Sequence, residues 1–325
     1  MGRAAAQADS RTPVTVITGY LGAGKTTLLN HLLSQSEQRL AVIVNEFGDV
    51  GVDGALVASG AEELVELANG CLCCVVRGDL IRTLRNLAPR LSDFDGVVIE
   101  TSGLANPSPV LQTLHADQVI GALYRLNGVV TVVDALHLKS AIASDPIAVE
   151  QIAMADLVVL NKSSSAPNLG DAVARIAAIN RAAATHETDY GQVPPVFLTH
   201  LEPARVETYR ATIAGPTIDH VAAGGITSLS VTCDAPLDAS RLSQWMTEYL
   251  GIHGGDVIRS KGLVRVIYDG RPLLVQSVNT IVTGEFLEEW PTGAEPKTAI
   301  VFIGRRLDRG ALEKGILGCV AVEKV

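Results

Sequence analysis

Eight residues near the amino end constrain the fold of this chain more than any other part of its sequence. Residues 19–26 read GYLGAGKT, which has the spacing G-x-x-x-x-G-K-[ST]. A β-branched run, VTVI, precedes the glycines, and a helical pattern, TLLNHLLS, follows them. Glycines let successive backbone N–H groups point at phosphate oxygens, and the following helix adds the positive end of its dipole. The segment therefore predicts a strand–loop–helix unit that binds phosphate.

The side chains of this loop have predicted parts in binding a nucleoside triphosphate. The ammonium group of Lys25 neutralises the outer phosphates, and the hydroxyl group of Thr26 is a ligand for Mg²⁺. The residues predicted to contact the nucleotide in this segment are Gly19, Gly22, Ala23, Gly24, Lys25, Thr26 and Thr27.

A second acidic element follows a later apolar run. Glu100 comes directly after VVI, and Gly103 lies three residues further on. In P-loop proteins such a carboxylate orients the attacking water or holds Mg²⁺ through a water, and a glycine N–H contacts the γ-phosphate. Lys25, Glu100 and Gly103 are therefore the predicted catalytic group.

Asn161 and Lys162 follow another apolar run, where guanine-binding proteins carry Asn-Lys-x-Asp. The residue two places after the lysine is Ser164 rather than aspartate. A carboxylate accepts two hydrogen bonds from the N1–H and the N2 amino group of guanine, and a hydroxyl group cannot match that geometry. Losing the contact costs about 1–3 kcal/mol. We expect Asn161 and Lys162 to bind GTP, and ATP is the alternative.

Apolar runs alternate with helical segments over the first two-thirds of the chain. The runs expected to be strands after the first lie at 40–47, 95–103, 126–135, 155–163 and 195–200, and helical spacing appears at 78–91 and 171–184. Apolar runs bounded by glycine and separated by helices predict an α/β fold, a P-loop NTPase parallel sheet with helices on both faces.

The pattern changes near residue 215. Small polar residues and glycine at 215–225 predict a linker, and residues 226–325 carry strands and two helices typical of a smaller C-terminal α+β domain with a mainly antiparallel sheet. Residues 1–12 are expected to be a flexible tail, and residues 13–214 a P-loop GTPase domain.

The charge and hydropathy of the chain exclude some classes of partner. The net charge is −9, and no run of lysine or arginine occurs, which argues against nucleic acid. No stretch has eighteen uninterrupted apolar residues and no signal-peptide core precedes the first strand, so we expect no membrane partner and a cytoplasmic protein.

Three of the five cysteines lie within four positions, at Cys71, Cys73 and Cys74. Thiolates are soft ligands for Zn²⁺ and also bind Co²⁺ and Ni²⁺. In the cytoplasm, clustered cysteines are more often metal-binding or redox-active than disulfide-bonded. The trio therefore predicts a transition-metal site, and a redox switch or apolar packing remain the alternatives.

The cysteines fall between the phosphate loop and Glu100, where P-loop proteins carry segments that respond to the γ-phosphate. The segment NEFGDVGVDG precedes them and contains Glu46 and Asp53. We expect both carboxylates to have a functional role, with Asp53 binding the nucleotide. If the sulfurs are ligands, nucleotide state and metal affinity change each other equally.

The motifs together resemble one family, the CobW-type P-loop GTPases, which includes the zinc-regulated GTPase metalloprotein activators. The stretches that carry the resemblance are TGYLGAGKTTLLN, NEFGDVGVDG, ELANGCLCC, VVIETSGLANP, GVVTVVDA, ADLVVLNK and, near the carboxyl end, GDVIRSKGLVRV and AIVFIGRRLD. The resemblance runs over nearly the whole chain.

This resemblance implies a slow GTPase that binds Zn²⁺ or Co²⁺ and delivers the metal to a client protein. It implies that Cys71, Cys73 and Cys74 are the metal ligands, with Glu46 as an additional one, and that GTP, GDP, a client metalloprotein and a second copy in a homodimer are the partners to consider. The alternative function is a nucleotide-dependent assembly factor for a client metalloenzyme, in which the cysteines are structural or redox-active.

Overall fold

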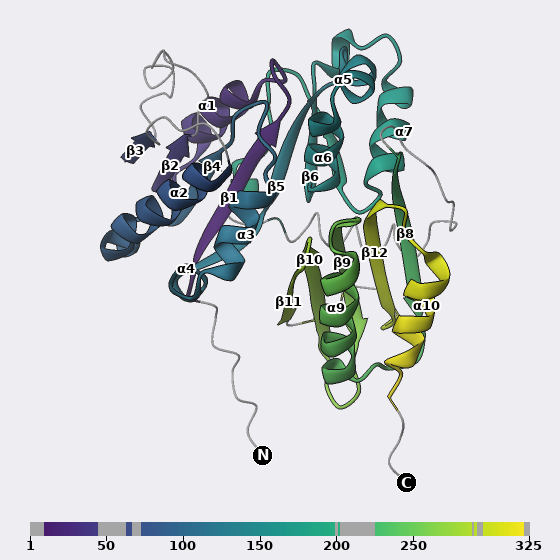
Figure 1. The fold of residues 1–325 in the computed structure, drawn as a ribbon. Coiled ribbons are helices and arrows are strands. Elements are labelled where there is room, and N and C mark those ends of the chain that lie inside the picture. The colour runs from purple at the N-terminus through teal and green to yellow at the C-terminus, as the bar shows by residue number, and fades with distance from the viewer. Residues whose placement is uncertain are drawn as a thin grey trace.

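The structure is a computed structural model, and it describes residues 10–44, 63–66, 73–198, 201, 225–287, 289–290 and 295–321. Two sheets organise these residues (Figure 1). The amino-terminal sheet has seven strands and the carboxyl-terminal sheet has five.

All strand pairs of the seven-stranded sheet are parallel. Across the sheet the strands are β3 (Glu63–Glu66), β2 (Leu40–Val44), β4 (Gly96–Glu100), β1 (Thr12–Gly19), β5 (Tyr124–Asp134), β6 (Leu157–Asn161) and β7 (Ala184–Glu187). Because parallel strands end at one edge, the phosphate loop after β1 and Glu100 at the end of β4 lie at the same edge.

Helices cover both faces of this sheet, which confirms the predicted α/β fold. Alternate residues of β4 show this, because Val97 and Ile99 belong to one core cluster and Val98 to another. Helix α1 (Lys25–Gln35) packs in the second cluster. The first cluster takes in α2 (Cys73–Leu87), α3 (Ser108–Ala116), α4 (Gln118–Leu123), α5 (Leu138–Ser144), α6 (Pro146–Ala153) and α7 (Leu169–Ile179).

One strand prediction was wrong. Residues 195–200 were expected to be a strand, but Pro195–Leu198 form a short 3₁₀ helix. The edge strand next to β6 is instead β7, which begins at Ala184. Helical spacing had been predicted to continue to this residue, but α7 ends at Ile179. Asn180 ends α7 earlier, because its amide nitrogen donates to the carbonyl oxygens of Ile152 at 2.8 Å and Ala155 at 2.9 Å. These bonds turn the chain back into the sheet.

The five-stranded sheet is antiparallel, as predicted. Across it the strands are β11 (Ile281–Phe286), β10 (Pro272–Val278), β9 (Val257–Arg265), β12 (Thr298–Arg305) and β8 (Ile226–Cys233). Helices α9 (Ala239–His253) and α10 (Arg309–Gly318) pack on one face, against β12 residues such as Ile300 and Phe302. The predicted linker falls almost entirely outside the described residues, so the domain boundaries stay a prediction.

The other face of this sheet shares a core with the seven-stranded unit. Val301 and Ile303 of β12 belong to the same buried cluster as Val129 of β5. Successive side chains of β12 point to opposite faces of the sheet, so one face packs against α9 and α10 and the other packs against the seven-stranded unit.

A buried charge group also joins the two sheets. Asp156 pairs with Arg259 at 2.7 Å and with Lys261, and all three side chains are at most 8% exposed. Its other oxygen accepts from the backbone N–H of Val129 at 2.9 Å. Burial alone would raise the pKa of Asp156, but the two cations outweigh burial and hold that pKa well below its ordinary value.

No helix among the described residues is long and apolar enough to span a membrane.

Candidate functional site

The phosphate loop connects β1 to α1 and depends on three glycines in the left-handed region. Gly19, Gly22 and Gly24 have φ values of 143°, 71° and 104°. A Cβ atom at Gly19 would overlap the carbonyl oxygen of Val132, and one at Gly24 would overlap the amide nitrogen of Asn161. Both positions therefore require glycine.

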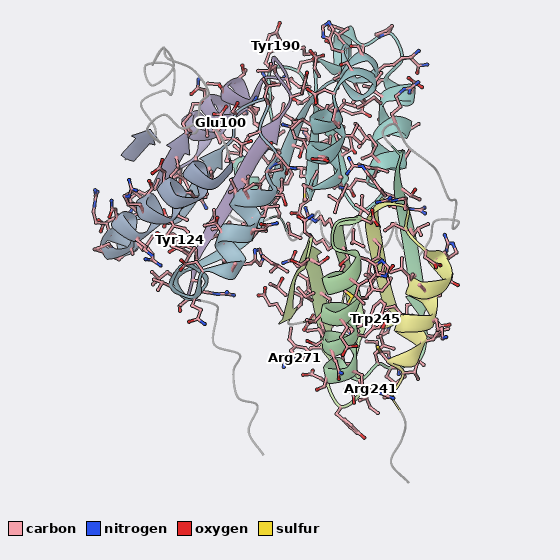
Figure 2. All side chains as sticks on the ribbon, viewed as in Figure 1. Glu100, Tyr124, Tyr190, Arg241, Trp245 and Arg271 are labelled. Carbon is pink, nitrogen blue, oxygen red and sulfur yellow. The ribbon has the colours of Figure 1, made fainter. Side chains whose placement is uncertain are left out.

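Thr26 and Glu100 meet although 74 positions separate them in the sequence. The Thr26 Oγ1 donates a hydrogen bond to Glu100 Oε1 at 3.1 Å. Glu100 is 6% exposed and ends β4 beside β1, at the edge shown in Figure 2. A hydroxyl group beside a carboxylate is the oxygen donor set that Mg²⁺ prefers. The two residues therefore fit the predicted magnesium site.

Gly103 lies directly against the phosphate loop. A Cβ atom there would be 2.9 Å from the Leu21 nitrogen. Gln151 of α6, which is 1% exposed, holds this segment by donating to the carbonyl oxygens of Gly103 at 3.2 Å and Ala105 at 3.1 Å. Gln151 was not predicted as a site residue, because a single glutamine in an apolar helix does not indicate which groups it will contact.

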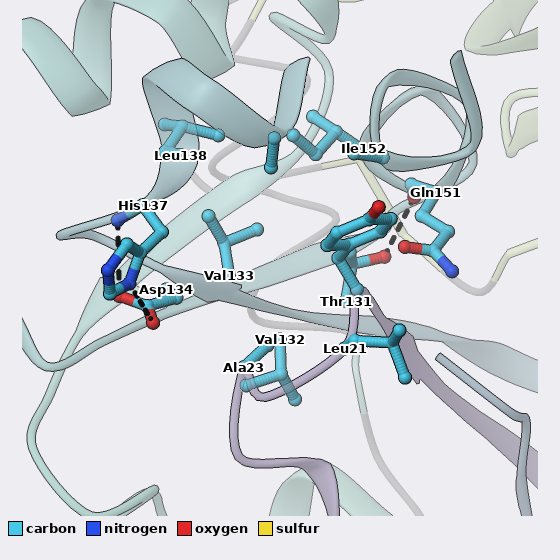
Figure 3. A pocket seen from close by; sticks show the side chains of 13 residues that line it. Leu21, Ala23, Thr131, Val132, Val133, Asp134, His137, Leu138, Gln151 and Ile152 are labelled. Atoms are coloured by element: carbon cyan, nitrogen blue, oxygen red, sulfur yellow. Dashed lines mark hydrogen bonds and ion pairs between the residues drawn. The ribbon is translucent and has the colours of Figure 1, made fainter. Parts of the chain in front are cut away.

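Tyr20 anchors the phosphate loop to Asp145. Its hydroxyl group donates to Asp145 Oδ2 at 3.0 Å, and this bond raises the pKa of Tyr20. The Tyr20 carbonyl oxygen accepts from Lys25 Nζ at 3.5 Å. The cavity beside the loop, with Thr131 and Leu138 on its walls, measures about 30 Å³ (Figure 3). That volume suits about two water molecules and not a nucleotide base.

Asn161 joins the phosphate loop to the segment after β7. Its amide nitrogen donates to the carbonyl oxygen of Ala23 at 2.9 Å, and its amide oxygen accepts from the N–H of Gly191 at 3.1 Å. The side chain is 3% exposed, so these bonds fix its orientation.

Lys162 bonds both to the phosphate loop and to an acidic side chain. Its Nζ donates to the Gly22 carbonyl oxygen at 2.9 Å and to Asp134 Oδ2 at 2.7 Å. Burial would raise the pKa of Asp134, but hydrogen bonds from Lys162 and His137 outweigh it and lower that pKa. A charged Asp134 therefore holds Lys162 over the loop at neutral pH.

Most of the nucleotide residues predicted from the sequence thus lie together at one sheet edge, and Thr27 lies in the first turn of α1. The predicted metal residues are different. Glu46 and Cys71 lie outside the described residues, and so does Asp53, which was predicted to bind the nucleotide. Cys73 and Cys74 begin α2, and only their place in the helix is described. Among the described residues, no group of three side chains that could hold a metal ion occurs. The transition-metal site therefore stays a prediction.

A parallel sheet with this loop, this buried glutamate and this asparagine–lysine pair defines a P-loop nucleotide-binding protein. Residues 13–188 match the family described as "CobW/HypB/UreG, nucleotide-binding domain", and residues 226–320 match "Cobalamin synthesis protein cobW C-terminal domain". The chain belongs to this family of P-loop GTPases, which confirms the resemblance and the enzyme class predicted from the sequence.

Named relatives agree with this assignment. The chain is 33% identical to "Zinc chaperone YjiA" of Escherichia coli (strain K12), over 94% of this chain and 98% of the relative. It is 39% identical to "Zinc-regulated GTPase metalloprotein activator 1" of Schizosaccharomyces pombe, over 57% of this chain and 47% of that protein.

A solved structure resembles nearly the whole chain. A Zn(II)-bound triple mutant of the YjiA GTPase, in which one glutamate and two cysteines are replaced by alanine, superposes with a TM-score of 0.74 and 29% identity. The match covers 96% of this chain and 99% of that chain.

Proposed function

We propose that this chain hydrolyses GTP and carries zinc as cargo, binding it at Cys71, Cys73 and Cys74 with Glu46 and passing it to a client protein. The observation that carries the proposal is the pairing of Thr26 with Glu100 at the sheet edge where β3, the strand that precedes the cysteines in the sequence, also ends.

Hydrolysis follows from the groups around the phosphate loop. Lys25 and the loop N–H groups hold the phosphates, Thr26 is a magnesium ligand, and Glu100 orients the attacking water. Gly103, fixed by Gln151, offers its N–H to the γ-phosphate. Magnesium, when bound, neutralises charge that develops on the phosphate oxygens.

The strand register supports coupling between nucleotide and metal. Val44 of β2 pairs with Glu100 on one side and with Glu66 on the other. Strand β3 therefore ends at the edge that carries Glu100, and α2 begins at Cys73, seven residues after Glu66. Seven residues span at most about 25 Å, so the chain between β3 and α2 is short enough to keep Cys73 within that distance of the end of β3.

Zinc is the cargo that the relatives favour. Thiolates accept both zinc and cobalt, so ligand chemistry alone leaves the choice open. Two relatives carry zinc in their names. The mutated residues in the solved YjiA structure, a glutamate and two cysteines, are of the types predicted here. Because zinc is bound in that mutant, zinc binding alone does not identify a thiolate site.

A contact between the sheets offers a route from nucleotide to client. Glu150 of α6 accepts from the Asn106 amide at 2.7 Å and from Arg305 of β12 at 2.9 Å. Asn106 lies three residues after Gly103, and Arg305 ends a strand of the five-stranded sheet. Movement of the Gly103 segment would therefore reach the carboxyl-terminal sheet, where we place the client. A homodimer stays a prediction.

Replacing all three clustered cysteines with serine is expected to abolish the response of GTP hydrolysis to zinc, while hydrolysis without zinc continues. Serine keeps the size of the side chain but removes the thiolate that zinc requires. Phosphate release would be measured with and without one equivalent of metal, and cobalt(II) absorption would report sulfur ligation directly. Cys233→Ala, which changes a buried cysteine of the other sheet, is the matched control.

An unchanged zinc response in the triple variant would reject the thiolate site. The cysteines would then be structural or redox-active, and the nucleotide-dependent assembly factor would become the leading function.

A further inference from the structure

A carboxylate lies beside Ser164, the position at which the Asn-Lys-x-Asp motif of guanine-binding proteins has its aspartate. The backbone N–H of Ser164 donates to Asp189, at 3.2 Å from Oδ1 and 3.4 Å from Oδ2. Asp189 comes from another part of the chain, the segment that follows β7. Its side chain is partly exposed, so it is open to a ligand.

The segment that carries Asp189 is fixed to the nucleotide edge. The N–H of Thr188 donates to the Leu160 carbonyl oxygen at 2.9 Å, and Gly191 donates to Asn161. Gly191 has a φ of 67°, and a Cβ atom there would lie 2.7 Å from the Cα of Leu28 in α1. Asp189 therefore lies in a short segment that is fixed on one side by the bond of Thr188 to β6 and on the other by the contacts of Gly191 with Asn161 and α1.

Backbone strain marks the same place independently. Lys162 and Tyr190 have φ values of 60° and 55°, in the left-handed region that bulky residues rarely adopt. Such conformations persist where the surrounding structure enforces them, and they cluster at ligand sites. The two strained residues lie on either side of the contact between Ser164 and Asp189. Tyr190 is 77% exposed, at the upper edge in Figure 2.

We propose that Asp189 reads the guanine base in place of the aspartate that position 164 lacks. A carboxylate has about four acceptor positions, so the Ser164 N–H leaves enough for the N1–H and the N2 amino group. Adenine has no hydrogen at N1 and no amino group at C2, so Asp189 discriminates against ATP. This inference rests on the proposed GTPase function and names the residue that selects its substrate.

Asp189→Asn separates base reading from a structural role. Asparagine can still accept from the Ser164 N–H, so the turn is kept. Xanthine has a carbonyl oxygen where guanine has its amino group, and the asparagine amide can donate to it. We expect Asp189→Asn to weaken GTP binding about ten- to hundredfold and to strengthen xanthosine triphosphate binding by a similar factor.

The experiment is competition of GTP, ATP and xanthosine triphosphate against a fluorescent guanine nucleotide on the full chain. Asp171→Asn, which changes an exposed carboxylate of α7, is the matched control and should leave all three affinities unchanged. Asp189→Ala should lose the preference for GTP over ATP. The double variant Ser164→Asp, Asp189→Ala should regain it, because the carboxylate returns at the motif position, and this variant decides the matter if Asp189→Asn does not fold.

The possible outcomes distinguish a failure of the proposed GTPase function from a failure of the proposed role of Asp189. If wild type binds no nucleoside triphosphate, the proposed function fails. If wild type prefers GTP and Asp189→Asn keeps that preference with no gain for xanthosine triphosphate, only the role of Asp189 is overturned. Equal binding of GTP and ATP by wild type overturns it as well.

Discussion

Replacing Lys25 with alanine is expected to lower the rate of GTP hydrolysis by about 10²–10³-fold. The loop holds Lys25 where its ammonium group can bridge the loop carbonyl of Tyr20 and the outer phosphates. Removing a fixed positive charge from the site of developing negative charge takes away stabilisation that the transition state needs more than the ground state does. Single-turnover release of phosphate at saturating GTP measures this loss without interference from product release.

Lys139→Ala is the control, because Lys139 is an exposed lysine of α5 outside the site. Its rate should match that of wild type. If Lys25→Ala also matched wild type, any observed hydrolysis would come from another source, and the assignment of the phosphate loop as the catalytic site would be wrong.

Asp156→Ala is expected to lower the free energy of unfolding by about 3–5 kcal/mol. The substitution removes the carboxylate that pairs with the buried Arg259 and Lys261 at the junction of the two sheets. Urea unfolding at about pH 7, where Asp156 is ionised, measures the loss. Asp171→Ala removes an exposed pair with Arg175 and should cost at most about 0.5 kcal/mol.

The free energy of unfolding of the wild-type protein in acid also reports on the buried charges around Asp156. Because the pKa of Asp156 is lower in the folded state, its contribution is complete above the unfolded pKa of about 3.9 and is lost as the pH falls below that value. Asp156→Ala should therefore show a shallower loss of stability in acid than wild type. An equally steep loss would mean that other carboxylates dominate acid unfolding.

The nucleotide edge could be predicted from the sequence because its parts follow from local rules. The glycine spacing specifies the loop, and an apolar run that ends in Glu100 specifies a strand end. Parallel strands bring such ends together, so the contact between Thr26 and Glu100 follows from topology although the two residues are distant in the chain.

Other parts depend on contacts that no local pattern contains. Asn180 stops α7 by bonding to carbonyl groups at and just after the end of α6, and this contact decided between helix and strand near residue 184. The edge strand β3 has four residues with glutamate at both ends, too short to show a strand period. Asp189 was missed for a similar reason, because the absence of aspartate at position 164 does not indicate which distant segment lies beside Ser164.

The most direct test of the proposed function is the affinity for zinc in two nucleotide states. Zinc would be titrated against a competing chelator with the full chain saturated either with GDP or with a non-hydrolysable GTP analogue, beside the Cys71, Cys73, Cys74→Ser variant. We predict that the wild-type zinc affinities differ by about fivefold or more between the two states, that zinc changes the affinity for the GTP analogue relative to GDP by the same factor, and that the variant shows neither effect. Equal zinc affinity in both nucleotide states of wild type would contradict a GTPase that carries and releases metal.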